Sequence, residues 1–227
     1  MTDDSEKPPV LFSEGLAFFG AVTASVSHEL NNVMSIIDQT AGLLQDMIAA
    51  EREGTPINIE RLAGAGHAVQ VQTERGLGII KRLNRFSHSA DETCTEFDVA
   101  EVLGNLVELC RRLANLKYVQ LDLESCAERP KLVGSPFFVQ AAVFLSLRLA
   151  LAAAKRDDAI GVSIGTDGSD VVVTLKCPRP IDVGNRDATS LQLVMDHSGA
   201  RLNIRNEGNG TLLDLVFVGG GRNGSSG

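Results

Sequence analysis

Mainly apolar positions recur at helical spacing through the first part of the chain. Between about Ser13 and Glu51 no proline occurs. In this stretch Val26, Leu30, Val33, Ile37, Thr40 and Leu44 follow one another at alternating steps of four and three. That period places them on one face of an α-helix. The pattern therefore predicts one long amphipathic helix.

A second long helix is predicted to run back along the first. The segment EREGTPIN, residues 51–58, holds a glycine, a proline and an asparagine, which are residues that end one helix and cap the next. A similar rhythm then continues through Ile59, Leu62, Gly66, Val69, Thr73, Leu77, Ile80 and Leu83. Two helices of about 30 to 38 residues make a hairpin about 45 to 55 Å long. Such a hairpin cannot bury its whole apolar stripe by pairing once, so we expect it to dimerise into a four-helix bundle.

The pattern changes after SHSADETC, residues 87–94, where short helical and alternating segments follow one another. The expected helices cover 99–116, 135–155 and about 189–198. The expected strands cover 118–124, two segments around an Asp-Gly turn within 160–177, 200–207 and 211–218. Helices with mainly antiparallel strands predict an α/β two-layer sandwich, and the chain as a whole is assigned to the α+β class.

These patterns divide the chain into four parts. Residues 1–12 are acidic and contain prolines, and we expect a disordered tail there. Residues 13–92 form the predicted hairpin, and residues 95–218 form the predicted sandwich. Residues 219–227 are rich in glycine, so a flexible tail is expected at this end.

Charge and hydropathy exclude several kinds of partner. The net charge of -8 and the pI near 5.0 argue against nucleic acid and anionic membranes, which do not attract an acidic surface. The apolar run at 141–154 is interrupted by Arg148 and is shorter than a bilayer span, so we expect no membrane insertion. The first residues lack the features of a secretion signal, which favours the cytoplasm.

Cysteines and most histidines indicate no metal site. Cys94, Cys110, Cys126 and Cys177 form no C-x-x-C pair, so reduced thiols are expected. His197 has no second ligand at metal spacing. His67 and His88, on the second predicted helix, are expected to be structural.

The stretch SVSHELNN, residues 25–32, carries the strongest chemical signal. His28 lies two positions from both Val26 and Leu30, which is about 200° around a helix, and therefore faces away from the apolar stripe. Asn32 shares its side one turn along, and Glu29 flanks it. An exposed imidazole beside a carboxylate is suited to nucleophilic and acid–base chemistry. A solvated helix face is the alternative interpretation.

Another nucleophile in this stretch has little support. Ser27 stands in no G-x-S-x-G turn, and a hydroxyl in the middle of a helix commonly bonds its own backbone. Hydrolase chemistry is therefore not expected.

The sequence resembles sensor histidine kinases in both halves. SHELNN on a helix, with a return helix that ends in RLNRFS, is similar to their dimerisation and phosphoacceptor domain over residues 13–90. Residues 96–124 have the layout that opens their ATP-binding domain. The resemblance implies that His28 is the phosphoacceptor and Glu29 its acid/base partner. It also implies that Asn32 helps to position a water molecule for dephosphorylation.

The resemblance fails at the nucleotide site. In SLRLALAAA, residues 146–154, Ser146 and Ala150 stand where the family has asparagines that hold magnesium and phosphates. In KCPRPI, residues 176–181, Lys176 replaces an aspartate that binds adenine, and two prolines replace glycines. The segment IDVGNRDATS, residues 181–190, is too short for the family's lid over ATP. We therefore expect the chain to bind no cofactor.

A phosphoacceptor histidine without an ATP site must receive phosphate from another protein. The first hypothesis is a histidine phosphotransfer protein of a phosphorelay, which forms a homodimer. Its expected partners are response-regulator receiver domains, which would carry the magnesium, and a hybrid histidine kinase. The second hypothesis is a binding module, a pseudokinase that regulates a histidine kinase or a response regulator. The third is a working sensor kinase with an unusual nucleotide site.

Overall fold

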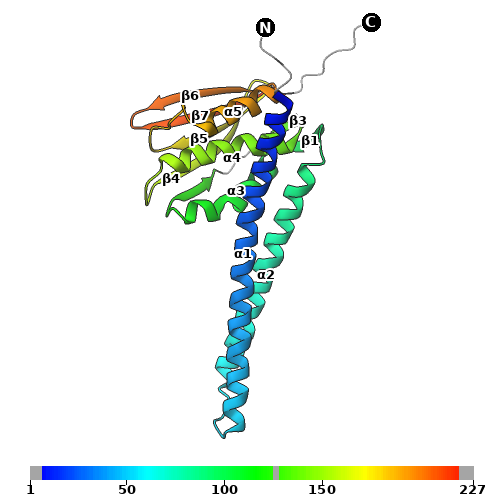
Figure 1. Ribbon diagram of the computed structural model, residues 1–227, viewed down its shortest axis with the longest axis vertical. Helices are drawn as coiled ribbons and strands as arrows, with labels where there is room; N and C mark the ends of the chain where they lie inside the picture. Colours follow the sequence, from blue (N-terminus) through cyan, green and yellow to red (C-terminus); the bar gives the residue numbers. More distant parts are fainter. Residues whose placement is uncertain (1–6, 125–127, 220–227) are drawn as a thin grey trace. The chain divides into compact units, whose positions relative to one another are not determined.

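The computed structural model describes residues 7–124 and 128–219, and the side chains from Leu11 onward. It forms two compact units. One consists of residues 23–84, and the other of the segments up to residue 22 and from residue 85. The division falls within the two long helices that Figure 1 labels α1 and α2. Residues 7–22 at the start of α1 and residues 85–89 at the end of α2 therefore belong to the second unit.

Helices α1 (Lys7–Arg52) and α2 (Ile59–Ser89) form the predicted helical hairpin. The connection turns at Gly54, whose φ of 94° lies in the region that glycine adopts without strain. Asn58 then caps α2, because its Oδ1 accepts a hydrogen bond of 2.8 Å from the Arg61 N–H. Within residues 23–84 the two helices approach closely where Gly76 lies against Val33. The hairpin is confirmed, and its dimerisation stays a prediction.

Helix α1 starts earlier than the sequence pattern predicted. The helix begins at Lys7, so the disordered tail expected over residues 1–12 is wrong from residue 7 onward. Prolines 8 and 9 lie in the first turn, where backbone N–H groups have no helical partner and proline is tolerated. Residues 1–6, and nearly all of the tail expected over 219–227, lie outside the described residues.

The second unit contains the expected two-layer sandwich. Its five-stranded sheet has the order β2-β4-β5-β7-β6, in which the pairing of β2 with β4 is parallel and the other pairings are antiparallel. These strands are β2 (Gln120–Leu123), β4 (Ala159–Asp167), β5 (Asp170–Cys177), β6 (Arg201–Glu207) and β7 (Gly210–Phe217). Helices α3 (Val99–Asn115), α4 (Pro136–Ala153) and α5 (Arg186–His197) pack on one face of this sheet.

A small second sheet was not predicted. Strand β1 (Thr95–Asp98) pairs antiparallel with β3 (Lys131–Gly134). Each strand has four residues, which is too few for an alternating pattern to stand out in the sequence. The pair leads the chain into α3 and α4, because Asp98 caps α3 and Ser135 precedes α4.

Helix α4 is the centre of the core. It is long and apolar enough to cross a membrane by length and composition alone, but 72% of that segment is buried inside the fold. Phe144, Leu147 and Leu149 are almost completely buried, as expected for a helix that packs between a sheet and other helices. The prediction of a buried core helix is therefore confirmed.

An aromatic cluster joins the first turns of α1 and the end of α2 to α4. The ring centroid of Phe18 lies 5.2 Å from those of Phe86 and Phe137 and 4.9 Å from that of Phe144. Phe86 is completely buried, and its ring stacks on Phe19 at 5.3 Å. Beside the cluster, Gln140 donates a buried hydrogen bond of 2.8 Å to the Ser89 hydroxyl. These contacts explain why the helix ends belong to the second unit.

Candidate functional site

Helix α1 presents His28 to solvent on the hairpin. His28 and Asn32 are exposed, whereas Val26 and Val33 on the apolar stripe are 1% and 2% exposed. The opposite orientation of these positions follows from the helical period, as the sequence indicated. The side chains predicted to carry chemistry thus lie on one accessible face of α1.

Glu29 is fixed by a residue of the other helix. Arg75 of α2 donates a hydrogen bond of 3.0 Å from Nη2 to Oε1 of Glu29. Glu29 is half-buried, with 24% of its side chain exposed. Arg75 cannot be identified from the sequence alone, because the spacing within each helix does not set how the two helices align. The candidate site therefore includes His28, Glu29 and Asn32 from α1, and Arg75 from α2.

The hydroxyl beside His28 is not a free nucleophile. Ser27 Oγ donates a hydrogen bond of 2.9 Å to the Thr23 carbonyl, one turn back along the helix. This is the backbone bonding that was expected of a serine in the middle of a helix. The Ser27 hydroxyl thus gives its proton to its own helix, and the exposed imidazole of His28 is the stronger candidate nucleophile.

Ser146 and Ala150, the α4 residues that the sequence analysis compared with asparagines, face the core. Ser146 is completely buried, and its hydroxyl donates a hydrogen bond of 2.9 Å to the Ala142 carbonyl. Ala150 is also completely buried, and its carbonyl lies 3.8 Å from Cys177 Sγ. A methyl group cannot coordinate magnesium, and a serine held by its own helix offers little to a hard cation.

Charged side chains around these positions pair with one another. Arg148, exposed on α4, forms an ion pair of 3.0 Å with Asp187 at the start of α5. After β5, Arg179 donates two hydrogen bonds, of 2.8 and 2.9 Å, to the carboxylate of Asp158. Residues 178–185 alone connect β5 to α5. This region is therefore organised by ion pairs between protein groups.

The Arg179–Asp158 pair predicts a pH-dependent stability. The hydrogen bonds from Arg179, with one from the Lys155 backbone, lower the pKa of Asp158 to about 2. Because an unfolded aspartate titrates near 3.9, this stabilisation is complete above about pH 4 and is lost as the pH falls towards 2. Arg179→Met should therefore lower the urea midpoint of unfolding most above pH 4, with a difference that shrinks towards pH 2. A difference that does not change with pH would contradict this assignment.

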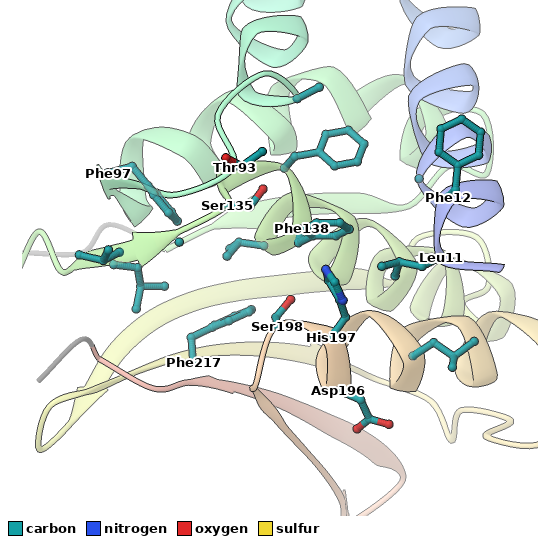
Figure 2. Close-up of a pocket in the computed structure, with 18 of the residues that line it drawn as sticks. Leu11, Phe12, Thr93, Phe97, Ser135, Phe138, Asp196, His197, Ser198 and Phe217 are labelled. Atoms are coloured by element: carbon teal, nitrogen blue, oxygen red, sulfur yellow. The ribbon is translucent and has the colours of Figure 1, made fainter. Parts of the chain in front are cut away.

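A large cavity lies elsewhere in the second unit. It has a volume of about 1010 Å³ and is bounded by the first turns of α1, the small sheet, the start of α4 and the end of α5. Figure 2 shows Phe12, Phe97, Phe138 and Phe217 around it, with the His197 ring close to Phe138. His28, Glu29 and Asn32 do not line this cavity. It is apolar and carries none of the predicted chemistry.

The remaining histidines and the cysteines show no shared site. His197 packs edge-on against Phe138 at 4.7 Å, and His88 lies 3.8 Å from the Asp91 carboxylate at the end of α2. Cys94, Cys110 and Cys177 are free thiols, and burial raises the pKa of Cys110 to about 12; Cys126 lies outside the described residues. Within residues 7–124 and 128–219, no group of three or more His, Cys, Asp or Glu could hold a metal ion.

The chain matches no protein-family model and no curated protein. Its structure is similar to histidine kinase AdeS of Acinetobacter baumannii, with 10% identity over 86% of this chain and 98% of that chain, at a TM-score of 0.48. It is similar to a bacterial phosphotransferase, with 13% identity over 88% and 96% of the two chains and a TM-score of 0.47. It is also similar to histidine kinase ThkA in complex with response regulator protein TrrA, with 15% identity over 90% of this chain and 63% of that chain, at a TM-score of 0.48. These likenesses are of fold alone and assign no activity.

Proposed function

We propose that this chain is a histidine phosphotransfer protein of a two-component phosphorelay. It accepts a phosphoryl group on His28 from the aspartate of a response-regulator receiver domain and passes it to another receiver, without using ATP. The observation that supports this most is a contrast between two regions. His28 stands exposed beside a fixed carboxylate, whereas the α4 positions that would hold magnesium-ATP carry a buried alanine and a serine bound to its own helix.

The transfer needs only groups that the two proteins supply. The Nε2 lone pair of His28 attacks the phosphorus atom in line, and a new N–P bond forms. The P–O bond to the receiver aspartate breaks, and its electron pair returns to that carboxylate. The ring proton on Nδ1 is held by the carboxylate of Glu29, which offsets the charge that develops on the imidazole. Magnesium, which this step requires on the aspartyl side, belongs to the receiver.

Exposed apolar side chains support a homodimer through the hairpin. In the single chain, Leu77, Ile80, Met34 and Leu43 are between 44% and 62% exposed, although they lie on long helices. Leu77 and Ile80 stand three positions apart and share one face of α2. An exposed apolar face on a long helix is typical of a surface that a second copy covers in a four-helix bundle. Two copies give two equivalent His28 sites. We place this dimer in the cytoplasm, where receiver domains are found.

A charge in this surface should separate the two copies. Leu77 is 62% exposed in the single chain, so Leu77→Glu leaves the fold of the hairpin intact. In the dimer the new carboxylates would be buried against an apolar surface, which is unfavourable. We therefore expect light scattering to show a shift towards the monomer. Gln45→Glu adds the same charge at an exposed polar position and serves as the control. A dimer that tolerates Leu77→Glu unchanged would show that this surface is not the interface.

The test of the function is a two-step transfer. The protein is mixed with a receiver domain that carries a labelled aspartyl phosphate, the label on the chain is measured, and a second, unlabelled receiver is then added. We expect an acid-labile, alkali-stable label on this chain that declines as the second receiver gains it. A protein that binds receivers but never carries label would instead be the binding module of the second hypothesis.

A further inference from the structure

The ion pair between Arg75 and Glu29 joins the two helices beside the proposed phosphoacceptor. The two residues are 46 positions apart in the sequence, and their atoms Nη2 and Oε1 are 3.0 Å apart. The exposed fractions of the side chains are 43% for Arg75 and 24% for Glu29. Both residues lie within the unit of residues 23–84, so the contact belongs to the hairpin alone.

Stability gives only a weak reason for this pair. Exposed ion pairs contribute little to folding, because water screens the charges and two long side chains lose freedom. The hairpin is already held by buried apolar contacts such as those of Val26, Val33 and Ile79. Arg75 therefore has a stronger effect on the position of the Glu29 carboxylate, next to His28, than on the stability of the hairpin.

We propose that Arg75 is a positioning residue for phosphoryl transfer at His28, an inference that rests on the proposed function. An arginine guanidinium presents its hydrogen-bond donors in a fixed plane, which suits it to hold a carboxylate in one orientation. By binding Oε1 it restrains the Glu29 side chain. We assign the other oxygen, Oε2, as the acceptor that the His28 ring uses during transfer. Arg75 itself does not contact the reacting atoms in this account.

This restraint selects the reactive form of the imidazole. A neutral imidazole carries its proton on either nitrogen, and the partner of one nitrogen decides which form dominates. An acceptor held at Nδ1 keeps the proton there, so that the lone pair is on Nε2. Nε2 then forms the N–P bond while the P–O bond to the receiver aspartate breaks. The electron pair goes to that aspartate, and the Nδ1 proton remains shared with Glu29.

The closing experiment compares Arg75→Gln, Arg75→Lys and wild type in single-turnover transfer from a phosphorylated receiver. We expect Arg75→Gln to slow the transfer roughly tenfold, which is less than the 10² to 10⁴ of an acid–base group itself. The dissociation constant of the receiver should not change, and Arg75→Lys should recover part of the rate. Arg61→Gln removes the same charge about four turns away on the same helix and should transfer at the wild-type rate.

Nitrogen NMR of the His28 ring gives a readout that a purely structural role would not change. The population of the Nδ1-protonated form should fall in Arg75→Gln while the helical content and melting temperature stay constant. If wild type is labelled on His28 and Arg75→Gln matches its rate and tautomer population, this inference is wrong and the proposed function stands. Loss of rate through weaker receiver binding would make Arg75 a docking residue and also overturn it. A wild type that no receiver labels would refute the proposed function itself.

Discussion

Replacement of His28 by alanine is expected to abolish acid-labile phosphate on the chain. An N–P bond needs a nucleophilic ring nitrogen, and alanine has none. Ser27 cannot substitute, because its hydroxyl is bound to the Thr23 carbonyl and an oxygen ester of phosphate would be stable to acid. Label from a phosphorylated receiver should therefore fall to background, as measured by gel autoradiography after acid and alkali treatment.

A matched control separates the chemistry from the fold. His67 lies exposed on α2 of the same hairpin, so His67→Ala removes the same group from a similar surface. This variant should be labelled like wild type. Circular dichroism should show equal helical content for both, since each substitution replaces an exposed residue with the strongest helix former. Label that persists in His28→Ala would contradict the assignment of the phosphoacceptor.

The second large effect is expected at the aromatic cluster. Phe86 is completely buried, and its ring centroid lies 5.2 Å from that of Phe18 and 6.2 Å from that of Phe137. Phe86→Ala removes these contacts and leaves a cavity that α-helices cannot close, so the free energy of unfolding should fall by about 3–5 kcal/mol. Urea denaturation followed by circular dichroism measures this change.

Phe12 provides the control for the cluster. This phenylalanine lies on α1, and 75% of its surface is exposed, in contrast to the buried Phe86. Phe12→Ala should therefore change the free energy of unfolding by no more than about 0.5 kcal/mol. A similar loss in both variants would mean that the cluster does not anchor the ends of the helices.

The long elements could be predicted from the sequence because their periodicity extends over many turns. The hairpin helices, α3, α4 and strands β4 to β7 all lie where the pattern placed them, within a few residues. Helix α5 begins at Arg186, before the start predicted near residue 189. Its cap, Asn185, is a recognisable signal, since its Oδ1 accepts a hydrogen bond from the Ala188 N–H. Prolines 8 and 9 are compatible with a tail, but they are equally tolerated in the first turn of a helix, and α1 begins with them at Lys7.

The candidate site could be predicted only as far as one helix determines it. The exposure of His28 and Asn32 follows from the phase of α1 alone. The pairing of Glu29 with Arg75 depends on the alignment of two helices, which the packing of Val33 against Gly76 helps to set. Likewise, the family resemblance implies that Ser146 and Ala150 stand at asparagine positions, but only the packing of α4 shows that both are buried. Contacts between elements thus required the structure.

The most direct test of the central claim compares two phosphate donors for one preparation of the protein. One sample is incubated with magnesium and labelled ATP, and the other with a receiver domain that carries labelled aspartyl phosphate; the labelled residue is then identified by mass spectrometry under alkaline conditions. A phosphotransfer protein without an ATP site should carry phosphate on His28 from the receiver and none from ATP. Phosphorylation of His28 from ATP alone, or a wild-type protein that takes no phosphate from any receiver of its own organism, would contradict it.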